Sequence, residues 1–272
     1  MKYTIKTTKY IFKNFLYVVP FTILPAFLLS LSIASDSIET VLTALFTGNL
    51  SAWTFADVFR AISVLNFGDL GSSVTGFLSI VAIFPCVALF MAFLEKHMRI
   101  GKRTFNGLLS KLNDNIPSTF GYGLLFLTIY EVWSLITAAL LYFVSLISNI
   151  IVAYIAVGVV FLAMHVVLLY TVGLIYLWLP CMQITGFPMM EALEYSHQLL
   201  TPVKWKILGG QLLALVGADA LICICVMFVP SGIFTLITTV LYVFLLLYYC
   251  VRMEIAYFDR DHIERADLRK YY

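Results

Sequence analysis

Three ionisable residues lie deep inside apolar runs of the chain: Glu131, His165 and Asp219. Each falls 13 to 16 residues into a predicted membrane-spanning helix, so all three reach a similar depth. A cluster of two carboxyl groups and an imidazole could bind a cation, relay a proton or hold a polar substrate. Because a charged side chain at mid-membrane costs about 2.5–3.5 kcal/mol on insertion scales, each should face the protein interior. The alternative is a clamp of interhelical hydrogen bonds, which contribute about 0.6 kcal/mol each.

A second polar set lies in the stretch GFPMMEALEYSHQLLTPVKWK, residues 186–206. Residues 187–201 are predicted to form an amphipathic helix on the cytoplasmic surface of the membrane, ended by Pro202. Its apolar positions share one face, whereas its charged positions share or flank the other. The predicted partner or lipid-headgroup surface consists of Glu191, Glu194, His197, Lys204 and Lys206.

A similar pattern occurs earlier, over residues 104–116, and is followed by Pro117. Apolar residues recur there at the same spacing, with an offset of 84 from the later helix. We expect a second short amphipathic helix at 104–116. Each such helix follows one predicted span and precedes another, which favours an internal repeat in which the second and third spans correspond to the fourth and fifth. Internal repeats are common in transport folds.

The composition identifies the class of protein. Of 272 residues, 62% are hydrophobic and 12% are charged, whereas soluble domains carry about 25% charged residues. Asp, Glu, Lys and Arg are absent from residues 132–190 and again from 220–251. Since about 20 helical residues cross a bilayer, the sequence predicts a polytopic bundle of transmembrane helices, a single all-α integral-membrane domain.

Dividing the long apolar runs gives six spans. Asn149 separates the third from the fourth, and the Pro230–Gly232 turn separates the fifth from the sixth. Three shorter spans over 115–185 are an alternative that the distribution of charge disfavours. The predicted spans cover about 12–34, 73–98, 118–147, 150–180, 203–228 and 233–257.

The basic residues predict the orientation. Sixteen of the 17 Lys and Arg residues fall in four segments, before span one, between spans two and three, at the start of span five, and from Arg252 to the C-terminus. With six spans, all four segments lie on one side, which the positive-inside rule makes cytoplasmic. Both termini are therefore expected in the cytoplasm. The formal net charge of +2 reflects this topology, and no nucleic-acid-binding patch is predicted.

Two further segments have alternative interpretations. The N-terminal lysines and apolar run resemble a signal peptide, but the run is longer than the usual 7–15 residues, so a retained span is expected. Residues 35–71 form the outer loop, with two apolar-periodic pieces at about 38–47 and 55–66. The loop is expected to lie over the outer mouth of the bundle, with a lid or plug as the alternative.

The second half of the chain resembles a known group. The residues that carry the resemblance are Pro180, Ala192, Leu193, Ser196, Leu199 or Leu200, and Trp205. This order is similar to that of uncharacterised bacterial polytopic membrane proteins and of the membrane domain fused to some glycerophosphodiester phosphodiesterases. The resemblance implies a helical bundle in a bacterial inner membrane. It implies no activity, and the phosphodiesterase barrel has no counterpart here.

The sequence contains neither a His-Glu-x-x-His metalloprotease motif nor a Gly-x-Ser-x-Gly elbow, so no enzyme activity, cofactor or metal site is predicted. The leading hypothesis is a non-enzymatic scaffold, accessory or regulatory subunit in the lipid bilayer. The alternative is a small transporter, or an ABC-type permease subunit with another membrane subunit or a cytoplasmic ATPase as partner. Residues 187–201 resemble a coupling helix, but the glycine expected after Glu191-Ala192 is missing.

Overall fold

The computed structural model describes residues 2–66 and 70–268. Within them the chain is all-α and contains no strand, which confirms the predicted class. Five helical stretches of the described chain are long and apolar enough to cross a membrane, and a bent pair at the N-terminus is a sixth candidate. Two predicted features fall partly outside this range, residues 67–69 of the outer loop and Arg269 and Lys270 of the tail. The principal helices are α1 (Lys2–Val18), α2 (Ile23–Leu31), α3 (Ser35–Thr47), α4 (Phe55–Ile62), α5 (Leu70–Ile100), α6 (Leu108–Ser145), α7 (Ile150–Leu174), α8 (Trp178–Pro180), α9 (Met189–Leu200), α10 (Lys204–Phe228) and α11 (Ser231–Arg260).

The first predicted span, 12–34, differs from the observed structure. The helix begins ten residues earlier, at Lys2, and a bend of 68° separates α1 from the nine-residue α2. Pro20 lies in the short 3₁₀ turn η1 (Val19–Phe21) at this bend. Because proline has no N–H to donate, a regular helix is interrupted there. At about 1.5 Å per residue, α2 alone is too short to cross a 30 Å hydrocarbon core.

The predicted separate helix at 104–116 is wrong. Residues 101–107 form no helix, and α6 runs from Leu108 through Pro117 to Ser145 without a break. An internal proline removes one backbone hydrogen bond, and long membrane helices tolerate this loss where neighbours support them. Lys111, in the second turn of α6, forms an ion pair of 2.8 Å with Glu95 of α5, so this early part of the helix is held by its neighbour.

The later connector forms the expected helix. α9 covers Met189–Leu200, and the 3₁₀ turn η4 (Thr201–Val203), which contains Pro202, joins it to α10. The preceding predicted span, 150–180, is less regular than expected. α7 ends at Leu174, and the chain continues through a turn and α8 into a π-helical turn, η3 (Cys181–Thr185). The two connectors therefore differ in structure, and the internal repeat stays a prediction.

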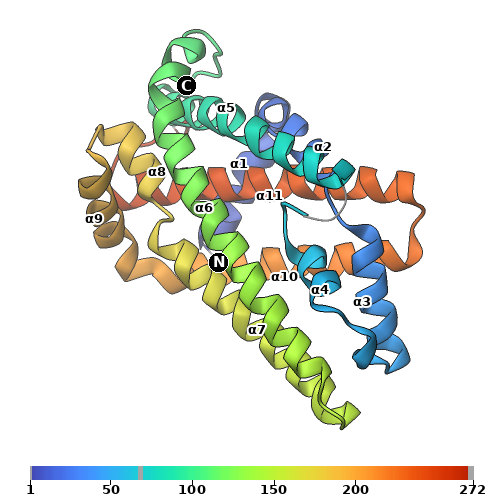
Figure 1. The fold of residues 1–272 in the computed structure, drawn as a ribbon. Helices are drawn as coiled ribbons and strands as arrows, with labels where there is room; N and C mark the ends of the chain where they lie inside the picture. The colour runs from blue at the N-terminus through green and yellow to red at the C-terminus, as the bar shows by residue number, and fades with distance from the viewer. Residues whose placement is uncertain (1, 67–69, 269–272) are drawn as a thin grey trace.

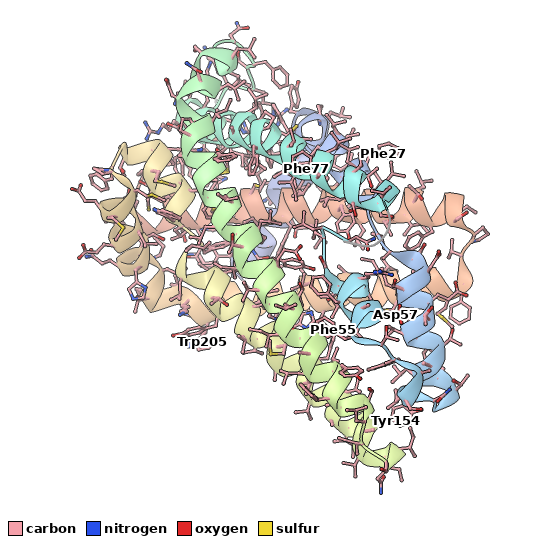
Figure 2. The ribbon with its side chains drawn as sticks, viewed as in Figure 1. Phe27, Phe55, Asp57, Phe77, Tyr154 and Trp205 are labelled. Carbon is pink, nitrogen blue, oxygen red and sulfur yellow. The ribbon has the colours of Figure 1, made fainter. Side chains whose placement is uncertain are left out.

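The molecule has two distinct ends (Figure 1). α8 and α9 lie at one end, whereas α3, α4 and the turn between α6 and α7 lie at the other. Asn149 begins α7 at that turn, where its side chain accepts hydrogen bonds from two backbone N–H groups. The predicted outer loop thus contains the helix pair α3–α4, and Tyr154 of α7 contacts this pair by donating to the Leu45 carbonyl over 2.6 Å (Figure 2).

The basic segments meet at the end that carries α9, which we call the basic end. Lys6 of α1 pairs with Asp259 of α11 over 2.6 Å. The Arg103 side chain donates to the Lys13 carbonyl, and Arg260 donates to the Leu199 carbonyl over 3.1 Å. Segments that the charge distribution assigned to one side of the membrane are therefore in contact with one another.

A fully buried arginine joins three helices at this end. Arg252 of α11 donates to the carbonyls of Lys206 and Ile207 in α10, at 3.2 and 2.9 Å. It also bonds the hydroxyls of Thr4 in α1 and Tyr248 in α11. A Cβ added at Gly210 would lie 2.8 Å from Cζ of Arg252, closer than side-chain carbons pack. The absence of a side chain at position 210 therefore admits the guanidinium.

We expect Gly210→Ala to destabilise the protein by about 1–3 kcal/mol, because the added methyl group displaces a guanidinium that is already hydrogen-bonded. The matched control is Gly209→Ala. This substitution also replaces a glycine in the interior of α10, but its Cβ meets nothing within 4 Å. Thermal unfolding of the two variants in the same detergent measures the difference. Equal midpoints would contradict the proposed tight contact.

Candidate functional site

Glu131 binds the short segment that follows α4, residues 63–65. Its Oε2 accepts a hydrogen bond of 2.7 Å from the Ser63 hydroxyl, and its Oε1 accepts from the backbone N–H groups of Val64 and Leu65 at 3.0 and 3.3 Å. These donors follow the end of α4, where the chain leaves the helix and its N–H groups need other partners. The carboxyl group of α6 therefore holds the segment that follows α4.

The same segment is held from its other side by α5. A Cβ added at Gly76 would lie 2.7 Å from the Val64 carbonyl oxygen, so the absence of a side chain there allows close backbone contact. Next to Glu131, Tyr130 donates to the Ile62 carbonyl over 2.9 Å. Residues 62–65 are thus fixed between α5 and α6.

His165 and Asp219, two of the three residues of the predicted cluster, are in contact with each other. The His165 Nε2 atom lies 2.9 Å from Asp219 Oδ2, which joins α7 to α10. The other ring nitrogen, Nδ1, lies 2.8 Å from the Phe161 carbonyl, one turn earlier in α7. The Trp133 ring packs edge-on against the imidazole, with ring centroids 5.3 Å apart, so α6 also contacts the His165 ring.

The predicted three-residue cluster is therefore divided. The hydrogen bonds join His165 to Asp219, whereas Glu131 makes its bonds to residues 63–65 and to Ser134 in its own helix. The His165 side chain is 2% exposed, but that of Asp219 is 34% exposed. An imidazole–carboxylate pair can clamp two helices or exchange a proton, and the Asp219 carboxylate is the half of the pair that lies at the surface of the helix bundle.

The charged surface predicted on α9 is present. Ala192, Ser196 and Leu200 are buried, whereas Glu191 and Glu194 are exposed on the opposite side. His197 and Gln198 are also exposed. The amphipathic pattern thus correctly predicted which face of the helix packs against the protein.

Side-chain hydrogen bonds hold α9 along its length. Trp178 of α8 donates to the Met189 carbonyl over 2.8 Å, and Arg260 of α11 donates to the Leu199 carbonyl. Near the middle, the Tyr195 hydroxyl donates to Asp261, which also accepts from Tyr257. The acidic face of α9 is consequently presented in a fixed orientation.

The two lysines that follow α9 point to different neighbours. The Lys204 ammonium lies 3.6 Å from the centroid of the Tyr170 ring in α7, a cation–π contact. Lys206 lines a pocket together with Lys2 of α1 and Asp259 of α11. Only the second lysine therefore belongs to a cluster of charges.

Two buried polar residues of the basic end were not predicted from the sequence. Arg252 was assigned to the basic tail, and Glu254, fully buried in α11, was not considered. Neither carboxyl oxygen of Glu254 has a hydrogen-bond partner in the described chain. Their position in the sequence could have indicated this burial, because both residues lie within the last long helix, before its end at Arg260.

The acidic and metal-ligating residues do not assemble into a metal centre in residues 2–66 and 70–268. No group of three or more His, Cys, Asp and Glu side chains there could hold a metal ion. The five cysteines are free thiols.

We expect Glu131→Ala to release residues 63–65, because the Val64 and Leu65 N–H groups would lose their acceptor. A part-buried donor left without a partner costs about 1–3 kcal/mol. Amide hydrogen exchange of residues 63–65 in detergent should accelerate. The control is Val132→Ala, which removes an adjacent side chain that is 52% exposed. Unchanged exchange in Glu131→Ala would show that the carboxyl group does not hold the segment.

His165 and Asp219 should be energetically coupled. A double-mutant cycle with His165→Ala and Asp219→Asn is expected to give a coupling of about 0.5–2 kcal/mol, the range of interhelical hydrogen bonds in membranes. Unfolding of the wild type, both single variants and the double variant supplies the four values. A parallel cycle that replaces His165→Ala by Val166→Ala, 44% exposed, should give no coupling. A zero value for the first cycle would exclude a clamp.

Comparison with known proteins gives no relatives: no protein-family model, curated protein or solved structure matches this chain. The resemblance carried by residues 180–206 therefore stays a prediction.

Proposed function

We propose that this chain is a non-enzymatic membrane scaffold or accessory subunit that presents the exposed face of α9 to a partner protein. The observation that carries the proposal is the contrast between the two sides of α9. One side is buried and hydrogen-bonded to α8 and α11, and the other displays Glu191, Glu194 and His197. A charged surface on a helix held in a fixed orientation suits recognition, because little backbone freedom is lost on binding.

The proposal includes an orientation, with both termini and α9 in the cytoplasm of a bacterial inner membrane. Contacts among the basic segments support it, since the positive-inside rule assigns such an end to the cytoplasm. The resemblance of residues 180–206 supports the bacterial assignment. The partner is then another membrane subunit or a cytoplasmic ATPase whose contact surface is basic opposite Glu191 and Glu194.

A second function, transport, is favoured by one observation. The carboxylate of Asp219 is 34% exposed although its partner His165 is 2% exposed, so one half of a pair that can exchange a proton lies at the surface of the helix bundle. In this alternative, Asp219 and His165 carry the transported proton or bind the solute, and Glu131 keeps residues 63–65 in place.

Reversal of charge on α9 tests the scaffold proposal. A photoreactive residue at the exposed position Gln198 should crosslink to a partner in native membranes. Glu191→Lys with Glu194→Lys should lower the yield at least about tenfold through like-charge repulsion. The thermal midpoint should not change, because both residues are exposed. The control is Asp36→Lys with Glu39→Lys, an equal change of charge on exposed residues of α3.

Equal crosslinking in both double variants, or none in the wild type, would contradict the scaffold proposal. Purified protein in proteoliposomes provides the opposing measurement, with an internal pH dye and an imposed pH gradient. The scaffold proposal expects no dissipation above that of empty liposomes. Dissipation that Asp219→Asn abolishes would instead establish the transport alternative.

A further inference from the structure

A polar pocket of about 280 Å³ lies at the basic end, where three helices meet. Lys2 and Tyr3 of α1, Val203 and Lys206 around the start of α10, and Asp259 and Arg260 of α11 line it. It lies apart from the exposed face of α9 and apart from the His165–Asp219 pair.

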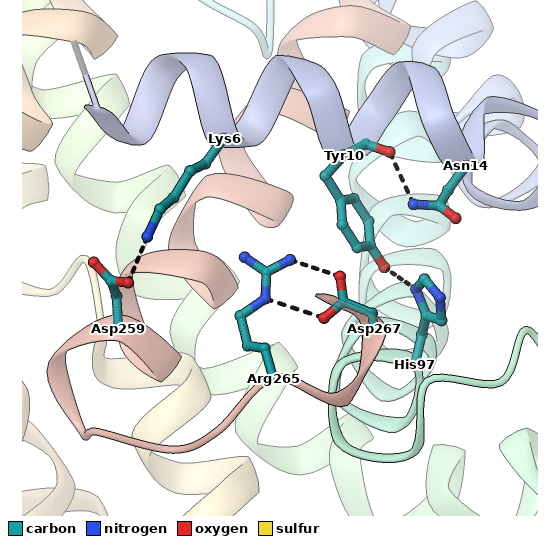
Figure 3. Close-up of polar contacts among 7 residues, drawn as sticks. All are labelled: Lys6, Tyr10, Asn14, His97, Asp259, Arg265 and Asp267. Carbon is teal, nitrogen blue, oxygen red and sulfur yellow. Dashed lines mark hydrogen bonds and ion pairs between the residues drawn. The ribbon is translucent and has the colours of Figure 1, made fainter. Parts of the chain in front are cut away.

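The charges around this pocket do not cancel. Lys6 and Lys2 both pair with Asp259, at 2.6 and 3.4 Å, as Figure 3 shows for Lys6. Lys206 and Arg260 also line the pocket, so its lining residues comprise three cations and one carboxylate, an excess of two positive charges (three minus one). Such an excess at the end of a membrane helix bundle favours an anionic ligand.

An apolar groove of about 270 Å³ lies between the same three helices. Its walls include Ile11 and Phe12 of α1, Ala214 of α10, and Phe244 and Leu245 of α11. At 1.5 Å per helical residue, Ala214 lies about 12 Å along α10 from Lys206, and Leu245 about 21 Å along α11 from Asp259. The groove thus lies farther along α10 and α11 than the charged pocket does.

Arg252 holds α1, α10 and α11 together around the pocket and the groove, which we call the seam. It stands on α11 between the pocket and the groove, and its bonds to Thr4, Lys206 and Ile207 fix the positions of α1 and α10. The carbonyl of Lys206, a pocket residue, and the hydroxyl of Tyr248, a groove residue, both accept from this guanidinium. The two parts therefore belong to one preformed surface.

We propose that this seam binds an anionic phospholipid, with its phosphate among Lys2, Lys206 and Arg260 and one acyl chain in the groove lined by Phe12, Ala214 and Phe244. The occupant follows from the charge of the pocket and the apolar lining of the groove together. The pocket matches a phosphate, and the apolar groove matches a hydrocarbon chain that enters the bilayer from it. A zwitterionic phospholipid lacks the net charge, and a soluble phosphate ester lacks the chain.

The test uses the purified full-length protein in detergent and native mass spectrometry. Dioleoyl phosphatidylglycerol and dioleoyl phosphatidylcholine are titrated separately, with glycerol 3-phosphate as the soluble competitor. We expect the wild type to bind phosphatidylglycerol at least about tenfold more tightly, since basic residues at the membrane surface contribute about fivefold each. Glycerol 3-phosphate should compete weakly, because it leaves the groove empty.

Two matched pairs of variants locate the site. Lys206→Gln should weaken phosphatidylglycerol binding about fivefold, whereas Lys204→Gln, whose lysine lies against Tyr170, should not. Ala214→Phe fills the groove and should also weaken binding, whereas Leu213→Phe, at a position 79% exposed, should not. Unchanged thermal midpoints without lipid exclude misfolding, and a variant that fails this check is replaced by Lys2→Gln.

Three outcomes would overturn the proposal. Equal binding of the two phospholipids would remove the role of charge. Equal effects of Lys206→Gln and Lys204→Gln would place the lipid elsewhere. Strong competition by glycerol 3-phosphate, with no effect of Ala214→Phe, would identify a soluble phosphate ester as the ligand.

Discussion

The buried guanidinium of Arg252 is the interaction on which the basic end depends. In the described chain its hydrogen-bond acceptors are carbonyls and hydroxyls, not a carboxylate. A buried cation without an opposite charge is costly unless it is hydrogen-bonded; both terminal nitrogens of Arg252 have acceptors, whereas its Nε has none in the described chain. This requirement fixes α1, α10 and α11 together, and it explains why α10 has glycine at position 210, where the helix meets the guanidinium. It also explains why the polar helix α1 packs against the bundle.

From this junction, polar contacts connect one helix to the next. His165 and Asp219 join α7 to α10, and Trp133 of α6 donates to the Met164 carbonyl of α7 over 2.6 Å. Glu131 then joins α6 to the segment after α4. Since apolar lipid offers these groups no alternative partner, each polar residue in a span specifies which helix lies beside it. The residues that suggested chemistry in the sequence thus also determine helix arrangement.

The sequence predicted features that depend on composition or on a single helix. Apolar length predicted that the later helices are long enough to cross a membrane, and the pattern of Ala192, Ser196 and Leu200 predicted the buried face of α9. Features that depend on neighbours were missed. Pro117 was predicted to end a helix, but packing against α5 carries α6 through it. The depth of Glu131 was predicted without its partners, because residues 63–65 lie almost 70 positions away in the chain and no local pattern indicates that they meet.

The start of α10 connects the two surfaces that we propose for binding. Lys204 contacts Tyr170 of α7, Trp205 is 67% exposed and projects from the surface (Figure 2), and Lys206 faces α1 and α11. Val203 lines the charged pocket and belongs to η4, the turn that joins α9 to α10. A lipid phosphate in the pocket would therefore contact the turn from which α9 extends. Because α9 is also bonded to α11 through Arg260, itself a pocket residue, an anionic lipid would stabilise the orientation in which the acidic face of α9 is presented.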